Sequence, residues 1–143
     1  MEKFEAVDPD FESRVRLGFE AQRLMQTLGA ELTGVALGEV WIGMPFGEAW
    51  TQQDGFLHAG VITAIVDSAC GFAAYTLMDA GSRVLSVEFK VNLLRPAAGE
   101  RFVAVGRVIK PGRTLTVCSG EVTAIAGGKE KLIAAMQATM MAV

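Results

Sequence analysis

A long apolar segment at the centre of the chain, residues 59–78, sets the strongest constraint on the fold. It reads Ala-Gly-Val-Ile-Thr-Ala-Ile-Val-Asp-Ser-Ala-Cys-Gly-Phe-Ala-Ala-Tyr-Thr-Leu-Met, and Asp67 is its one charged residue. A helix that is apolar almost all round must be enclosed on most sides. An aspartate in the middle of a bilayer costs about 3 kcal/mol on insertion scales, so we expect a buried helix rather than a membrane span. The buried carboxylate then needs a function that compensates for its cost.

The flanking segments predict an α+β fold with an antiparallel sheet. Asp8-Pro9 is typical of a helix start, and apolar residues at helical spacing predict one amphipathic helix that ends at Gly29. Residues 31–44 are predicted as one strand with a kink near Gly34 or Gly38. Four further strands are expected at 84–93, 101–110, 114–126 and 131–143. No strand–helix–strand repetition occurs, so the sheet should be antiparallel and curved around the central helix.

Length and composition indicate one domain, 1–143, in which 1–29 is an N-terminal helical addition. Hydrophobic residues make up 51% of the chain, and its net charge of −3 comes from mixed acidic and basic residues without a basic block. This distribution argues against nucleic acid as a partner. One histidine and two distant cysteines, Cys70 and Cys118, do not form a familiar metal site and are typical of buried thiols in a reducing compartment. With no secretory signal visible at the acidic N-terminus, we expect a cytoplasmic protein that does not contact a membrane.

Asp67 is the one residue of its helix face that can perform acid–base or nucleophilic chemistry. At helical spacing it shares a stripe of short side chains, namely Thr63, Asp67, Gly71 and Ala74. The single histidine, His58, precedes Asp67 by nine residues, which is about 13 Å of helix. The two side chains therefore cannot meet on one carbonyl group within one chain.

A twofold dimer removes this difficulty. If two such helices pack antiparallel, the backbone N–H groups of Ala59 and Gly60 at one helix start face Asp67 of the other. Hydrogen-bond donors opposite a carboxylate suit acyl hydrolysis, because the donors hold the oxyanion while the carboxylate attacks or activates water. The sequence therefore predicts an active site that two subunits share.

These residues also resemble a known family. Gln52, the His58-Ala-Gly60 motif, Asp67, a strand that contains Ser86 and the Leu94-Arg-Pro96 turn resemble the PaaI-like acyl-CoA thioesterases. The resemblance implies the hotdog fold, a curved antiparallel sheet around a long helix. It further implies hydrolysis of an acyl-CoA or aryl-CoA thioester to the free acid and CoA without a metal or organic cofactor. The implied assembly is a homodimer that forms the active site, with dimers paired into a homotetramer.

The resemblance also implies roles for individual residues. Asp67 matches the catalytic general base or nucleophile, Ala59 and Gly60 match the oxyanion donors, and His58 matches the histidine that orients their loop. Gln52 matches a residue that positions the thioester or the water, and Ser86 matches a hydroxyl beside the attacking water.

Three residues are expected to contact the substrate rather than to react. Arg95 and Arg113, in turns, are candidates for the CoA phosphates. Gly71 leaves room for a larger or aliphatic acyl group. The family motif is usually His-Gly-Gly, and the alanine in this chain requires ordinary backbone angles at position 59.

Two other functions remain open at the level of sequence. One is a hotdog-fold hydratase or dehydratase that acts on enoyl- or hydroxyacyl-thioesters. The other is a non-catalytic protein that binds acyl-CoA, in which Asp67 would have only a structural role. Neither the acyl group nor the choice between base and nucleophile follows from the sequence, since both roles need one carboxylate near one carbonyl.

Overall fold

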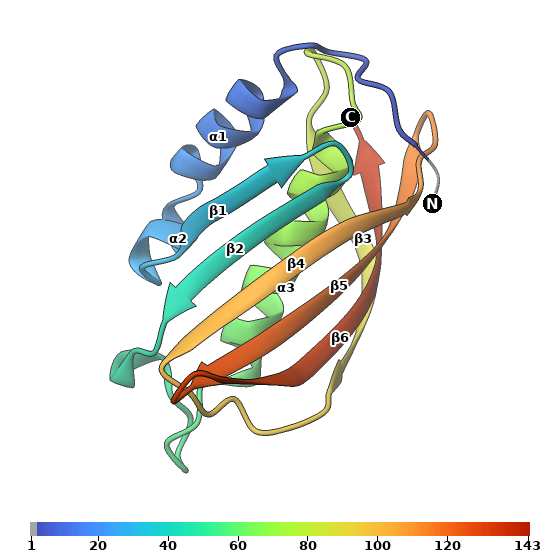
Figure 1. Cartoon of the computed structure of the whole chain (residues 1–143). Helices are drawn as coiled ribbons and strands as arrows, with labels where there is room; N and C mark the ends of the chain where they lie inside the picture. Colours follow the sequence, from blue (N-terminus) through green and yellow to red (C-terminus); the bar gives the residue numbers. More distant parts are fainter. Residues whose placement is uncertain (1–2) are drawn as a thin grey trace.

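The computed structural model describes residues 3–143 and shows a six-stranded sheet curved around one long helix (Figure 1). The predicted 1–29 addition therefore includes two residues, 1–2, that lie outside the described residues. The elements in chain order are α1 (Phe11–Ala21), α2 (Arg23–Thr27), β1 (Glu31–Ala36), β2 (Glu39–Pro45), the short 3₁₀ helix η1 (Glu48–Trp50), α3 (Ala59–Tyr75), β3 (Val84–Leu93), β4 (Arg101–Lys110), β5 (Leu115–Ala126) and β6 (Lys129–Ala142).

All neighbouring strands run antiparallel, in the order β1-β2-β4-β5-β6-β3. β3, the first strand after α3, therefore lies at one edge of the sheet beside β6 and does not pair with β4, the next strand in the sequence. This arrangement confirms the predicted α+β architecture with a curved antiparallel sheet around the central helix. No helix among residues 3–143 is long and apolar enough to cross a membrane.

The helix α3 lies directly on the backbone of the two central strands. Gly106 of β4 and Gly120 of β5 are paired opposite each other, beneath the middle of α3. A Cβ atom at Gly106 would lie 2.3 Å from the carbonyl carbon of Ala69, and one at Gly120 would lie 2.6 Å from Cγ2 of Val66. Two paired glycines thus allow α3 to approach the sheet more closely than any side chain would permit.

The edge strand β3 leaves most of its apolar side chains uncovered. Leu85, Phe89 and Leu93 are 58%, 44% and 51% exposed. Because β3 pairs with β6 on one side alone, its other edge has no strand partner among residues 3–143. The alternation of apolar and polar residues correctly predicts this strand. The apolar face, expected to be half-buried, is however largely exposed in the single chain.

Three details of the predicted elements are wrong. The N-terminal helix starts at Phe11, and it breaks at Gln22, whose extended backbone (ψ 96°) separates α1 from α2. Residues 31–44 form a hairpin rather than one kinked strand, because the chain turns at Gly38 with a left-handed φ of 74°. The central helix ends at Tyr75 with Thr76 as its C-cap, several residues before Gly81.

Arg14 anchors α1 to the end of α3. Its guanidinium donates hydrogen bonds to the carbonyl oxygens of Tyr75 and Met78, forms an ion pair with Asp8 at 2.9 Å, and lies 4.2 Å from the centre of the Tyr75 ring. A cation at the C-terminus of a helix also interacts favourably with the helix dipole. The N-terminal helix is thereby held against α3.

Candidate active site

The carboxylate of Asp67 lies in a cleft between α3 and β3. The cleft encloses about 100 Å³ and is lined by Gln22, Asp67, Ser68, Gly71, Phe72, Val84 and Ser86. Ser86 Oγ donates a hydrogen bond to Asp67 Oδ1 at 2.7 Å. The predicted proximity of Ser86 and Gly71 to the carboxylate is therefore present within one chain.

The environment of Asp67 raises the pKa of its carboxyl group. Burial is the main cause, because removal from water disfavours the charged form, and the hydrogen bond from Ser86 partly opposes it. Oδ2 accepts no hydrogen bond from residues 3–143, so this oxygen remains available to a water molecule or an acyl carbon. A carboxylate with a raised pKa and one free oxygen is suited to accept a proton.

The residues with short side chains that share a stripe with Asp67 differ in how deeply they are buried. Thr63 lies half-buried and Gly71 lines the cleft beside Asp67, but Ala74 is fully buried in the core. A Cβ atom at Gly71 would contact one atom, Met140 Sδ, at 3.9 Å. The expected open space at Gly71 is thus present.

The start of α3 is organised by His58, which is its N-cap residue. His58 Nδ1 accepts a hydrogen bond from the N–H of Gly60 at 2.8 Å. The Gly60 N–H is therefore already occupied, whereas the Ala59 N–H has no hydrogen-bond partner among residues 3–143. Of the two expected oxyanion donors, Ala59 is the one that is free in the single chain.

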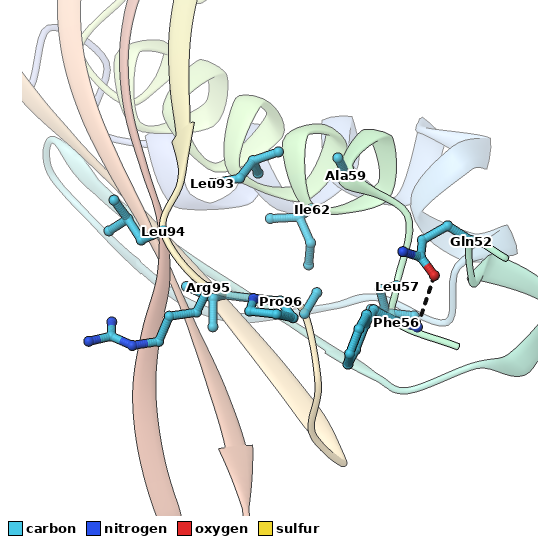
Figure 2. Close-up of a pocket in the computed structure, with 11 residues that line it drawn as sticks. Gln52, Phe56, Leu57, Ala59, Ile62, Leu93, Leu94, Arg95 and Pro96 are labelled. Carbon is cyan, nitrogen blue, oxygen red and sulfur yellow. Dashed lines mark hydrogen bonds between the residues drawn. The ribbon is translucent and has the colours of Figure 1, made fainter. Parts of the chain in front are cut away.

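A second and larger pocket adjoins the start of α3 (Figure 2). It encloses about 460 Å³ and is lined by Gln52, Phe56, Leu57, Ala59, Ile62, Leu93, Leu94, Arg95, Pro96, Ala97 and Ile133. Gln52 Oε1 accepts hydrogen bonds from the N–H groups of Asp54 and Phe56, which leaves its amide nitrogen directed toward the pocket. A mostly apolar pocket of this volume, with a few polar groups, is typical of small-molecule sites.

The two candidate phosphate ligands lie far apart. Arg95 lines the larger pocket, where its guanidinium donates to the carbonyl oxygen of Leu132 and remains exposed. Arg113 lies in the turn between β4 and β5, at the opposite end of the sheet, and lines neither the pocket nor the cleft. Sequence alone cannot distinguish them, because both are turn cations next to a proline or glycine.

The cleft and the pocket lie at opposite ends of β3. Val84 and Ser86 line the cleft, whereas Leu93 and Leu94 line the pocket. Seven residues of extended strand separate Ser86 from Leu93, which corresponds to about 23 Å. Within one chain, the carboxylate and the free Ala59 N–H therefore lie in two separate places, the cleft and the pocket.

Sequence reasoning missed four residues of the cleft, Gln22, Ser68, Phe72 and Val84, and Gln22 is the one from outside α3 and β3. Its side chain reaches α3 from the break between α1 and α2, and its Oε1 accepts a hydrogen bond from Ser68 Oγ at 2.8 Å. No local sequence signal marks this contact, because it joins residues 46 positions apart. The expected assignment of Cys70 to the core is confirmed, since the thiol is buried and burial raises its pKa.

A family model and a curated relative both match this chain, and both are thioesterases. Residues 54–131 match the model of the thioesterase superfamily. The chain is 31% identical over 112 residues to human acyl-coenzyme A thioesterase 13, which spans 77% of this chain and 79% of the relative.

Two solved structures show the same fold. A thioesterase family protein from Silicibacter pomeroyi superposes with a TM-score of 0.92 and 50% identity, over 93% of this chain and 98% of its own. The Escherichia coli PaaI protein superposes with a TM-score of 0.84 over 94% of each chain at 17% identity, and this likeness supports the fold alone. The predicted resemblance, the hotdog fold and the class of thioester hydrolase are therefore confirmed, and this chain belongs to the thioesterase superfamily.

Proposed function

We propose that this chain hydrolyses acyl-CoA thioesters, with Asp67 as the catalytic carboxylate. The observation that supports this most directly is the half-buried Asp67, which accepts a hydrogen bond from Ser86 and keeps its second oxygen free in a cleft. A structural carboxylate would be expected to have both oxygens satisfied when it is withdrawn from water. The family of the chain supports the same reaction, and human acyl-coenzyme A thioesterase 13 is named for it.

We propose further that the active site forms between two copies of the chain. The unpaired edge of β3 carries exposed apolar side chains, which is an arrangement that promotes pairing with another strand. If β3 of two copies pairs antiparallel about a twofold axis near its centre, Ser86 of one copy lies next to Leu93 of the other. The cleft of one subunit then joins the pocket of its partner, and each dimer has two complete sites.

In this arrangement each group has a distinct task. The thioester oxygen accepts a hydrogen bond from the free N–H of Ala59, while His58 holds the Gly60 N–H and keeps the helix start in place. Gln52 directs its amide nitrogen at the pocket and positions the thioester or the water. The pantetheine arm occupies the apolar pocket, and exposed Arg95 at its wall contacts a CoA phosphate. Arg113 lines neither the pocket nor the cleft, so its position does not support a contact with a CoA phosphate.

The reaction balances with these groups alone. As a general base, Asp67 accepts a proton from water as the water oxygen bonds to the thioester carbon, and the carbonyl oxygen becomes an oxyanion held by Ala59 N–H. The C–S bond then breaks, and the proton passes to the CoA thiolate. As a nucleophile, Asp67 would attack the thioester carbon, break the C–S bond, release the CoA thiolate and form an anhydride; water then cleaves the anhydride to the free acid, and a proton from that water goes to the thiolate. Neither route requires a metal or an organic cofactor.

The proposed homotetramer needs a second surface at which two dimers meet. On the face of the sheet away from α3, Leu85, Met141 and Leu115 are exposed and lie side by side on three neighbouring strands. This apolar row offers a second surface on which two dimers could pair. The cytoplasmic location stays a prediction from the sequence.

Release of free thiol from short, medium, long and aryl CoA thioesters tests the proposed activity. We expect hydrolysis by the wild type and a loss of at least about 10³-fold in kcat for Asp67→Asn, because the variant cannot accept the proton. Glu121→Gln is the matched control, since this exposed carboxylate lies on the outer face of β5. Full activity of Asp67→Asn would refute the mechanism. A loss of enoyl absorbance without thiol release would instead indicate a hydratase, and binding without turnover would indicate a non-catalytic protein.

A further inference from the structure

The N-terminal segment contributes a polar wall to the Asp67 cleft. Gln22 interrupts the helix between α1 and α2, and its backbone is held on both sides, because its N–H donates to Phe19 O and its carbonyl accepts from the N–H of Met25. The side chain extends across to α3, where Ser68 Oγ donates to Gln22 Oε1 at 2.8 Å. The break in the helix therefore places an amide group over the cleft.

Close packing of α1 on α3 keeps this amide in position. Phe19 and Phe72 meet edge to face with ring centroids 6.1 Å apart. Gly18 lies so close to α3 that a Cβ atom there would be 3.1 Å from Phe72 Cε1. Phe72 itself lines the cleft, so the same contacts that seat α1 also define the wall next to Gln22.

The amide nitrogen of Gln22 is the unused donor of this wall. Ser68 satisfies Oε1, whereas Nε2 has no hydrogen-bond partner among residues 3–143 and is not buried. When an acyl group and a partner subunit exclude water from the cleft, an unpaired amide N–H becomes costly. An acyl group that offers an acceptor oxygen removes that cost, whereas a plain alkyl chain does not.

The charge of the cleft narrows the choice of that acceptor. Asp67 lies in the same cleft, and its described surroundings include no cation, since the lining residues other than Asp67 are uncharged. A second carboxylate on the acyl group would therefore be repelled. Within one chain the cleft has a volume of about 100 Å³, smaller than the 150 Å³ or so that accommodates benzene in an engineered cavity, so the part of the acyl group beside Gln22 must be small.

From these contacts we propose that Gln22, oriented by Ser68, selects short acyl groups that carry a neutral acceptor oxygen, such as a hydroxyl or keto group, over alkyl chains of equal length. The proposal rests on the proposed thioesterase function. Gln22 is in this view a specificity residue, because it contacts the substrate away from the reacting atoms. A purely structural tie between α1 and α3 would affect stability but would not distinguish two acyl groups of the same size.

The experiment compares kcat/KM for two matched pairs, butyryl-CoA with 3-hydroxybutyryl-CoA and pentanoyl-CoA with 4-oxopentanoyl-CoA. In the wild type we expect the oxygenated member of at least one pair to be preferred about tenfold, which corresponds to one hydrogen bond left unmade in the other. Gln22→Leu should remove this preference within each pair, because leucine has a similar size and no donor. Gln26→Leu is the control, since this exposed glutamine lies one turn further along the same segment.

A wild type without preference in either pair, or a preference that persists in Gln22→Leu, would overturn the proposal while leaving thioester hydrolysis intact. The affinities of non-hydrolysable thioether analogues of the same pairs, measured by calorimetry, separate the two proposals. If no thioester is hydrolysed, the proposed function fails, but a tenfold affinity preference that Gln22→Leu abolishes would still support the polar wall. Equal affinities for the two analogues of each pair would refute the selectivity of Gln22, whether or not thioesters are hydrolysed.

Discussion

Replacement of Gly106 by alanine tests how the sheet positions the catalytic helix. The new Cβ atom would lie 2.3 Å from the carbonyl carbon of Ala69 and 2.4 Å from the N atom of Cys70, both backbone atoms of α3. Carbon atoms in contact are normally about 3.5 to 4.0 Å apart, so α3 would have to move by about 1–2 Å. Overpacking of this kind costs about 1–3 kcal/mol, and a clash with backbone belongs at the upper end.

The expected effect can be measured as a melting temperature and as activity. For a chain of this length, about 3 kcal/mol corresponds to a fall of about 6–12 °C. Asp67 lies two residues before Ala69, so the same displacement should lengthen the 2.7 Å hydrogen bond from Ser86 and lower kcat/KM. In Gly81→Ala the nearest atom would be Asp79 Oδ1 at 3.6 Å, and this control should melt within about 2 °C of the wild type. A Gly106→Ala variant with unchanged melting temperature and activity would refute the close seating of α3.

Three further predictions concern the site itself. Because burial raises the pKa of Asp67 above its unfolded value, the native state retains its proton over the pH range between the two values, and stability falls as pH rises through that range. Asp67→Asn should therefore melt higher than the wild type at pH 7, and urea titrations should show the gap closing below about pH 4; a lower melting temperature at pH 7 would contradict this. Ser86→Ala removes the hydrogen bond that lowers the pKa of Asp67, so the acid limb of the kcat/KM profile should move to higher pH, and an unmoved limb would separate Ser86 from the base. Ala59→Pro removes one N–H at the first helical position, where proline is tolerated, and His58 already has the extended angles (φ −59°, ψ 139°) that precede proline. We expect kcat to fall about 10²–10³-fold with little change in melting temperature, because the oxyanion loses its donor. An unchanged kcat would assign the oxyanion to another donor.

Local patterns made much of the fold accessible from the sequence. The apolar segment around Asp67 predicts α3, and the alternation in residues 84–93 predicts β3, because each depends on a periodicity within one element. The antiparallel sheet follows from the absence of strand–helix–strand repeats. The same reasoning singles out Asp67, since a lone charge in an apolar helix is conspicuous without any knowledge of its partners.

Contacts between distant segments account for what was missed. The helix break at Gln22 has no glycine or proline to mark it, and its side chain is held by Ser68, 46 positions away. The hairpin at Gly38 follows a leucine rather than the asparagine or aspartate that usually marks a two-residue turn. Arg95 and Arg113 lie in the turns at the two ends of β4, but whether a turn borders a pocket depends on how distant segments pack, which periodicity does not contain.

Complementation between two inactive variants is the most direct test of a site shared by two subunits. Asp67→Asn disables the cleft and Ala59→Pro disables the pocket, so each variant alone loses both sites of its homodimer. If equal amounts are unfolded together in denaturant and refolded, half of the dimers should be hybrids in which one of the two sites is intact. We expect the mixture to regain about a quarter of the wild-type kcat per chain, with each variant refolded alone as the control. A mixture that remains as inactive as the separate variants would contradict a site built from the cleft of one subunit and the pocket of its partner.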